Sequence, residues 1–101
     1  MNIFITQNGT EATVALEGRL DTSTAPELEA KLDTIPENVM ALSFDFGELR
    51  YVSSAGLRLL LASQKKMNSR GGTMVIHKPN ELIMEVFEAT GFSDILTIEN
   101  T

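Results

Sequence analysis

The sequence contains no cysteine and no tryptophan, a single histidine, and only eight basic residues against fourteen acidic ones. The lack of cysteine excludes a disulfide framework and a thiolate metal site, and it fits the reducing cytoplasm. A formal net charge of −6 argues against partners that require a basic surface, such as nucleic acids and anionic lipid headgroups. We therefore expect neither nucleic acid nor a membrane among the partners.

Long hydrophobic runs are also missing. The longest, residues 57–62, is interrupted by Arg58 and is far too short to span a bilayer. The opening residues, MNIFITQNGT, lack the basic segment and apolar core of a signal peptide. With 101 residues, 43% apolar and 22% charged, the chain has the size and composition of one globular unit. We expect a single cytoplasmic domain over residues 1–101, and a monomer.

Four segments have the composition of β-strands. Residues 2–6 and 12–20 flank the pair Asn8-Gly9, which favours a tight hairpin turn. Residues 41–49 alternate apolar and polar side chains, as a strand with one buried face would. Residues 73–77 (TMVIH) form a continuous apolar run, which predicts an interior parallel strand covered on both faces. A final short strand around residues 95–98 would complete the sheet.

Three segments have the periodicity and end signals of helices. The first begins at Thr24, which forms with Glu27 the pattern of a capping box. The second follows Ser54, a good candidate for its N-cap. The third begins after Asn80 and ends at Gly91, where glycine accepts the left-handed conformation.

The order of these elements is ββαβαβα with a possible final β. Alternating strands and helices with short connections predict an α/β fold. Its sheet would be mostly parallel and mixed, with four or five strands, an N-terminal antiparallel hairpin and helices packed against it.

The residues give little support to an enzyme. A catalytic serine needs a general base, and the only histidine is His77, with no G-x-S-x-G turn in the chain. The carboxylates lack the spacing of a metal site, and neither of the glycine-rich nucleotide-binding patterns is present. We expect no catalytic residue, no metal and no cofactor.

The loops that follow the second and third strands are the better candidates for a site. Such loops gather at one edge of a parallel sheet, so Asp21 and the pair Ser53–Ser54 should be neighbours if the two strands are adjacent. Two interpretations remain open from the residues alone. Ser54 is either a functional hydroxyl or simply a helix N-cap, and Asp21 is either functional or a turn carboxylate that accepts backbone N–H groups.

Three stretches share the patterns of one known family. Residues 17–32 (EGRLDTSTAPELEAKL) are similar to its G-x-L-D-x-x-T…L pattern. Residues 42–61 (LSFDFGELRYVSSAGLRLLL) are similar to its apolar strand followed by [D/S]-S-[S/T/A]-G-L and an apolar helix. Residues 71–98 are similar to its Gly-Gly, strand, helix, Thr-Gly and closing strand. The chain thus resembles, almost end to end, the STAS domain, and in particular the stand-alone bacterial anti-sigma factor antagonists.

This resemblance implies a phosphoswitch. In that family an unphosphorylated antagonist binds an anti-sigma factor that is also a serine kinase, and this binding frees the sigma factor. The kinase then phosphorylates one serine at the start of the second helix, the complex separates, and a serine phosphatase resets the switch. Alignment on SSAGL places the modified serine at Ser54. Ser53 takes a position often held by aspartate, and Asp21 matches the family's aspartate near the phosphorylation site.

The resemblance also implies a contact surface for the kinase. Gly56 would let the partner approach without a side chain in the way, and Arg58 follows Ser54 by one helical turn. An alternative interpretation keeps the fold without the switch, as a passive STAS module of a transport or sensory complex in which the serine only caps a helix. The expected partner-binding residues are Asp21, Thr22, Thr24, Ser53, Ala55, Gly56 and Arg58.

Overall fold

The computed structural model describes residues 1–100 and contains the predicted order of elements, ending in a fifth strand. The elements are β1 (Asn2–Asn8), β2 (Glu11–Leu20), α1 (Ala25–Leu32), β3 (Ala41–Val52), α2 (Ser54–Ser69), β4 (Thr73–His77), α3 (Glu81–Thr90), a short 3₁₀ helix η1 (Phe92–Asp94) and β5 (Thr97–Glu99).

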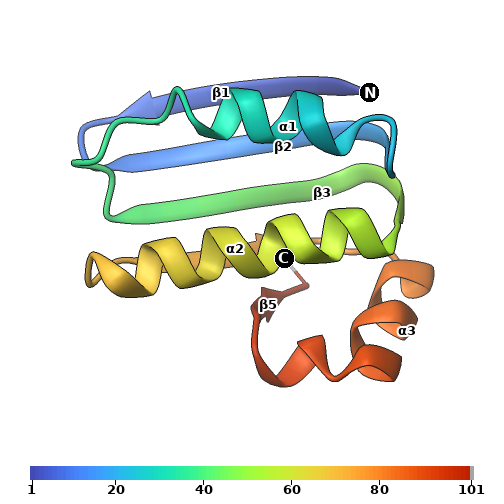
Figure 1. The fold of residues 1–101 in the computed structure, drawn as a ribbon. Helices are drawn as coiled ribbons and strands as arrows, with labels where there is room; N and C mark the ends of the chain where they lie inside the picture. Colours follow the sequence, from blue (N-terminus) through green and yellow to red (C-terminus); the bar gives the residue numbers. More distant parts are fainter. Residues whose placement is uncertain (101) are drawn as a thin grey trace.

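One five-stranded sheet organises the molecule, with its strands in the order β1-β2-β3-β4-β5. Strand β1 pairs antiparallel with β2, and β2 pairs parallel with β3 (Figure 1). The remaining two pairs, β3 with β4 and β4 with β5, are also parallel. Asn8 pairs with Glu11 across the predicted hairpin, where Gly9 adopts a positive φ of 63°. The predicted mixed sheet with an antiparallel N-terminal hairpin is confirmed.

The core lies on one face of this sheet. Inward side chains such as Val14, Phe44 and Ile76 are fully buried, and the helices add Leu28 and Phe87 to the same cluster. Helices α1 and α2 lie side by side in front of the strands (Figure 1). Because each strand–helix–strand connection steps to the next strand in the same direction, right-handed crossovers put all three helices on the same side.

The opposite face of the sheet remains open, which corrects one expectation. Strand β4 was expected to be covered on both faces, but only Met74 and Ile76 are buried. Thr73 is exposed, and Val75 and His77 are half-buried. The apolar run TMVIH therefore reflects a strand in the middle of the sheet that is covered on one face.

Strand β3 is longer than the sequence suggested, because it continues to Val52. Two register shifts occur along its pairing with β2, after Ala15 and after Gly18. They bring Leu20, the last residue of β2, opposite Val52. Both strands therefore end together, and the loops that follow them start at the same edge of the sheet.

Helix α2 contains one buried polar side chain, Gln64, which leads to a stability prediction. Its Nε2 donates to Asn68 Oδ1 at 3.0 Å, but its buried Oε1 has no hydrogen-bond partner within the described residues. A buried acceptor without a partner costs about 1–3 kcal/mol. We therefore expect Gln64→Met, which keeps the shape, to raise the free energy of unfolding by about 1 kcal/mol in urea denaturation.

The matched control is Lys65→Met, at an exposed neighbouring position of α2. It should change the free energy of unfolding by no more than about 0.5 kcal/mol. An equal or lower stability of Gln64→Met relative to the wild type would show that the Oε1 atom is well solvated in the native protein.

Candidate functional site

The ends of β2 and β3 bring the two predicted loops together. The Ser53 N–H donates to the Leu20 carbonyl at 2.8 Å, which ties the start of α2 to the residue that precedes Asp21. The expectation that Asp21 and the serine pair are neighbours at one edge of the sheet is confirmed.

The two serines have different roles, and the sequence interpretation assigned the cap to the wrong one. The N-cap of α2 is Ser53, whose extended backbone has φ −90° and ψ 177° and whose Oγ accepts the Gly56 N–H at 3.4 Å. The Ser53 carbonyl also accepts the first helical hydrogen bond, from Leu57 at 2.9 Å. Ser54 is the first residue of the helix and is exposed. Its hydroxyl is therefore available to a reagent or a partner.

Asp21 organises its own turn. Its Oδ1 accepts the Ser23 hydroxyl at 2.7 Å, the Ser23 N–H at 3.0 Å and the Thr24 N–H at 3.2 Å. The hydrogen bond from the Ser23 hydroxyl, with smaller contributions from the two N–H groups, lowers the pKa of the Asp21 carboxyl below its usual value. The carboxylate is thus ionised at neutral pH and holds the loop in one shape.

Thr24 ties the same loop to β2 instead of forming the predicted capping box. Its Oγ1 donates to the Arg19 carbonyl at 2.8 Å and accepts the Asp21 N–H at 2.8 Å. No side-chain hydrogen bond caps α1 at this residue. The Thr24 backbone is already helical, unlike that of a typical N-cap. Its hydroxyl therefore forms hydrogen bonds with preceding residues and not with the first turn of α1.

Arg19 contacts both the neighbouring strand β3 and the loop that follows β2. Its guanidinium carbon lies 4.5 Å from the centre of the Tyr51 ring on the neighbouring strand, within the range of a cation–π contact. Its Nε is 3.9 Å from Asp21 Oδ2. Arg19 therefore links Tyr51 of β3 to the loop beside the start of α2.

Gly56 serves the packing of the core. It is buried, and a Cβ atom at this position would lie 2.7 Å from Leu20 Cγ and 3.0 Å from Val52 Cγ1. The sequence interpretation attributed the missing side chain to the approach of a partner. The structure gives a different reason, which is that α2 must sit directly on the ends of β2 and β3.

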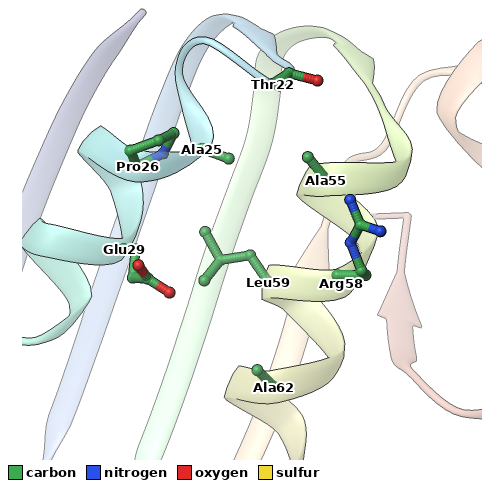
Figure 2. A pocket seen from close by; sticks show the side chains of 8 residues that line it. All are labelled: Thr22, Ala25, Pro26, Glu29, Ala55, Arg58, Leu59 and Ala62. Carbon is green, nitrogen blue, oxygen red and sulfur yellow. The ribbon is translucent and has the colours of Figure 1, made fainter.

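Three of the predicted partner-binding residues line one groove between α1 and α2. Thr22, Ala55 and Arg58 border a cavity of about 300 Å³, shown in Figure 2. The sequence interpretation missed the remaining lining residues. A signal was present, because Ala55 is followed by lining residues at positions i+3, i+4 and i+7, the spacing of one helix face. The missed residues are Ala25, Pro26, Glu29, Leu59 and Ala62.

This region combines a groove between two helices with an exposed serine hydroxyl. Among residues 1–100, no group of three or more histidine, cysteine, aspartate or glutamate side chains is placed to hold a metal ion. None of the helices in that part of the chain is long and apolar enough to cross a membrane. The N-terminus of α2 offers backbone N–H groups and the positive end of the helix dipole, which tolerate an anion at Ser54.

The structure is thus a small α/β domain with a sheet covered on one face and an exposed serine at the start of its second helix. Residues 3–97 match the family described as "Mlab, STAS domain", and the chain belongs to this STAS family. It is 28% identical over 98 residues to the anti-sigma-B factor antagonist of Bacillus subtilis (strain 168), covering 97% of this chain and 90% of that protein. The resemblance proposed from the sequence is confirmed.

Solved structures support the fold. The chain is similar to the anti-sigma factor antagonist SpoIIAA in its unphosphorylated form, with a TM-score of 0.83 and 19% identity over 99% of this chain and 89% of that one. It is also similar to the phosphorylated form of the Bacillus protein SpoIIAA, with a TM-score of 0.77 and 19% identity over 99% and 92% of the two chains.

Proposed function

We propose that this protein is an anti-sigma factor antagonist controlled by phosphorylation of Ser54. In its unphosphorylated form it binds an anti-sigma factor that is also a serine kinase, and it thereby releases a sigma factor in the cytoplasm. Phosphorylation by that kinase separates the complex, and a serine phosphatase restores the binding form. The observation that carries this proposal is the exposed Ser54 at the first position of α2, beside a neighbour that already caps the helix.

The position of Ser54 explains how a phosphate would act. It adds about −1.5 to −2 charges at pH 7. The free N–H groups at the start of α2 and the helix dipole stabilise such a charge, so the domain need not refold. The effect would instead fall on the interface, where a buried unpaired charge costs several kcal/mol, of order 2–5.

The names of similar proteins agree with this proposal. The Bacillus subtilis relative is named an anti-sigma-B factor antagonist. SpoIIAA is described as an anti-sigma factor antagonist and has been solved in both unphosphorylated and phosphorylated forms. Each of these similarities extends over nearly the whole chain, including the segment that carries Ser53 and Ser54.

The test uses the purified protein and the cognate anti-sigma factor kinase. Without nucleotide, the two should form a complex in titration calorimetry. With ATP, intact mass should show one added phosphate, phosphopeptide mapping should place it on Ser54, and the complex should dissociate. Phosphate on Ser53 or Thr24 would overturn the site. An absence of both binding and modification would favour a passive STAS module and overturn the switch.

A further inference from the structure

Two cavities lie along the seam between α1 and α2, and we refer to them together as the cleft; the larger one is the groove beside Ser54. A second, smaller cavity of about 30 Å³ lies farther along, lined by Leu32 and Ile35 on one side and by Lys66 and Met67 of α2 on the other. The lining positions of α2 extend from Ala55 to Met67, which corresponds to about 18 Å at 1.5 Å per residue. The two cavities together thus extend along about three turns of α2.

The walls of this cleft differ in charge. Helix α2 carries Arg58, Lys65 and Lys66 and no acidic residue, although the whole chain has a net charge of −6. Arg58 and Lys66 line the two cavities on the α2 side. The facing wall of the larger cavity carries Glu29.

The floor between the charged residues is mostly apolar. Small side chains from both helices, Ala25 and Pro26 of α1 and Ala55 and Ala62 of α2, leave the larger cavity open, and Leu59 points between the helices (Figure 2). Larger residues at these positions would fill the space. A partner can therefore insert apolar side chains here while its charged groups meet the rim.

We propose that this cleft binds an acidic, amphipathic α-helix of the anti-sigma factor. The inference rests on the proposed function and specifies the chemistry of the partner. Apolar residues of that helix enter between α1 and α2. Its carboxylates face Arg58 and Lys66, and a basic residue on its other edge faces Glu29.

The walls of the cleft favour a helix over an extended segment. Both walls are α-helices, whose backbone N–H and C=O groups already pair with each other. An extended segment laid on them would find no backbone partners, whereas a helix satisfies its own hydrogen bonds. Anchors at i, i+3/i+4 and i+7 of such a helix span about 10 Å, which fits within the combined length of the two cavities.

Arg58 connects this cleft with the switch. It lies four residues after Ser54, on the same face of α2 one turn along. A phosphate on Ser54 can therefore pair with the Arg58 guanidinium, the same group that faces a partner carboxylate in the cleft. Modification and docking then compete for one side chain.

Two variants test the cleft, both at exposed positions of α2. Ala62→Phe fills the larger cavity, and Arg58→Glu reverses the charge of its rim. Each should weaken binding of the cognate anti-sigma factor by about tenfold or more in calorimetry without nucleotide, with unchanged circular dichroism. Glu85→Ala, at an exposed position of α3, is the matched control and should bind like the wild type. Lysine substitution of the facing partner carboxylate should restore part of the affinity of Arg58→Glu.

The outcomes separate the inference from the function on which it rests. If the wild type binds and both variants bind equally well, the cleft inference is overturned and the proposed function stands. If the wild type does not bind the anti-sigma factor, the proposed function itself fails. If Ala62→Phe abolishes self-association in sedimentation and leaves anti-sigma factor binding unchanged, a second copy occupies the cleft and the inference is overturned.

Discussion

Ser54→Ala is expected to abolish phosphorylation by the cognate kinase while keeping the stability of the domain, and Ser53→Ala is expected to do the opposite. The reason is the division of roles at the start of α2, where the Ser53 hydroxyl caps the helix and Ser54 is exposed. Loss of a serine N-cap costs about 1 kcal/mol. Intact mass after incubation with ATP and urea denaturation measure the two effects on the same samples.

Binding measurements add a third readout to this pair of variants. Ser54→Ala should bind the anti-sigma factor like the unphosphorylated wild type, whereas Ser54→Asp should bind at least about tenfold more weakly because it places a charge at the interface. Ser54→Thr serves as the control that retains a hydroxyl and should still be modified. Phosphorylation of Ser54→Ala at Ser53 would contradict the assignment.

Gly56→Ala is expected to destabilise the protein by about 1–3 kcal/mol, because the added methyl group overpacks the core. The new Cβ would lie 2.7 Å from Leu20 Cγ and 3.0 Å from Val52 Cγ1, and Leu20 is fully buried. Helix propensity alone predicts the reverse, a gain of about 1 kcal/mol for alanine over glycine. The free energy of unfolding in urea decides between them.

Ala62→Gly is the matched control for this experiment. It makes the reverse change at an exposed position of the same helix and should cost about 1 kcal/mol from propensity. If packing governs Gly56, both variants are destabilised. A more stable Gly56→Ala would show that α2 can move away from the strand ends without cost. If the added methyl group pushes α2 away from the strand ends, Ser54 moves with the helix. Phosphorylation of Gly56→Ala should then also be slower than that of the wild type.

The sequence alone determined the order of the elements, the opening hairpin and the family. These features depend on local signals. The Asn8-Gly9 turn, the cap at Asn80 and the stop at Gly91 act through neighbouring backbone groups, and the structure has each where the pattern indicated. The proximity of Asp21 to the serine pair was also predictable, because parallel strands place their following loops at one edge.

Only the tertiary structure decided which serine caps α2. Ser53 and Ser54 are both suitable by type, and the choice falls on Ser53 because its N–H pairs with the Leu20 carbonyl and keeps its backbone extended. The role of Gly56 likewise depends on the tertiary structure, because the residues that leave no room for a Cβ atom belong to two strands. They are Leu20 at the end of β2 and Val52 at the end of β3.

The open face of the sheet and the cleft between α1 and α2 have the same physical origin. Each strand–helix–strand connection leads to the next strand in the same direction, so the helices all lie on one side of the sheet. This arrangement leaves the other face open and makes α1 and α2 neighbours. The run TMVIH contains no sign of this, since a strand in mid-sheet is apolar whether one face or both are covered. The sequence also does not show that Ala25 and Glu29 of α1 line one cavity with Ala55 and Arg58 of α2. Two helices become neighbours only when the strands that they connect pair in the sheet.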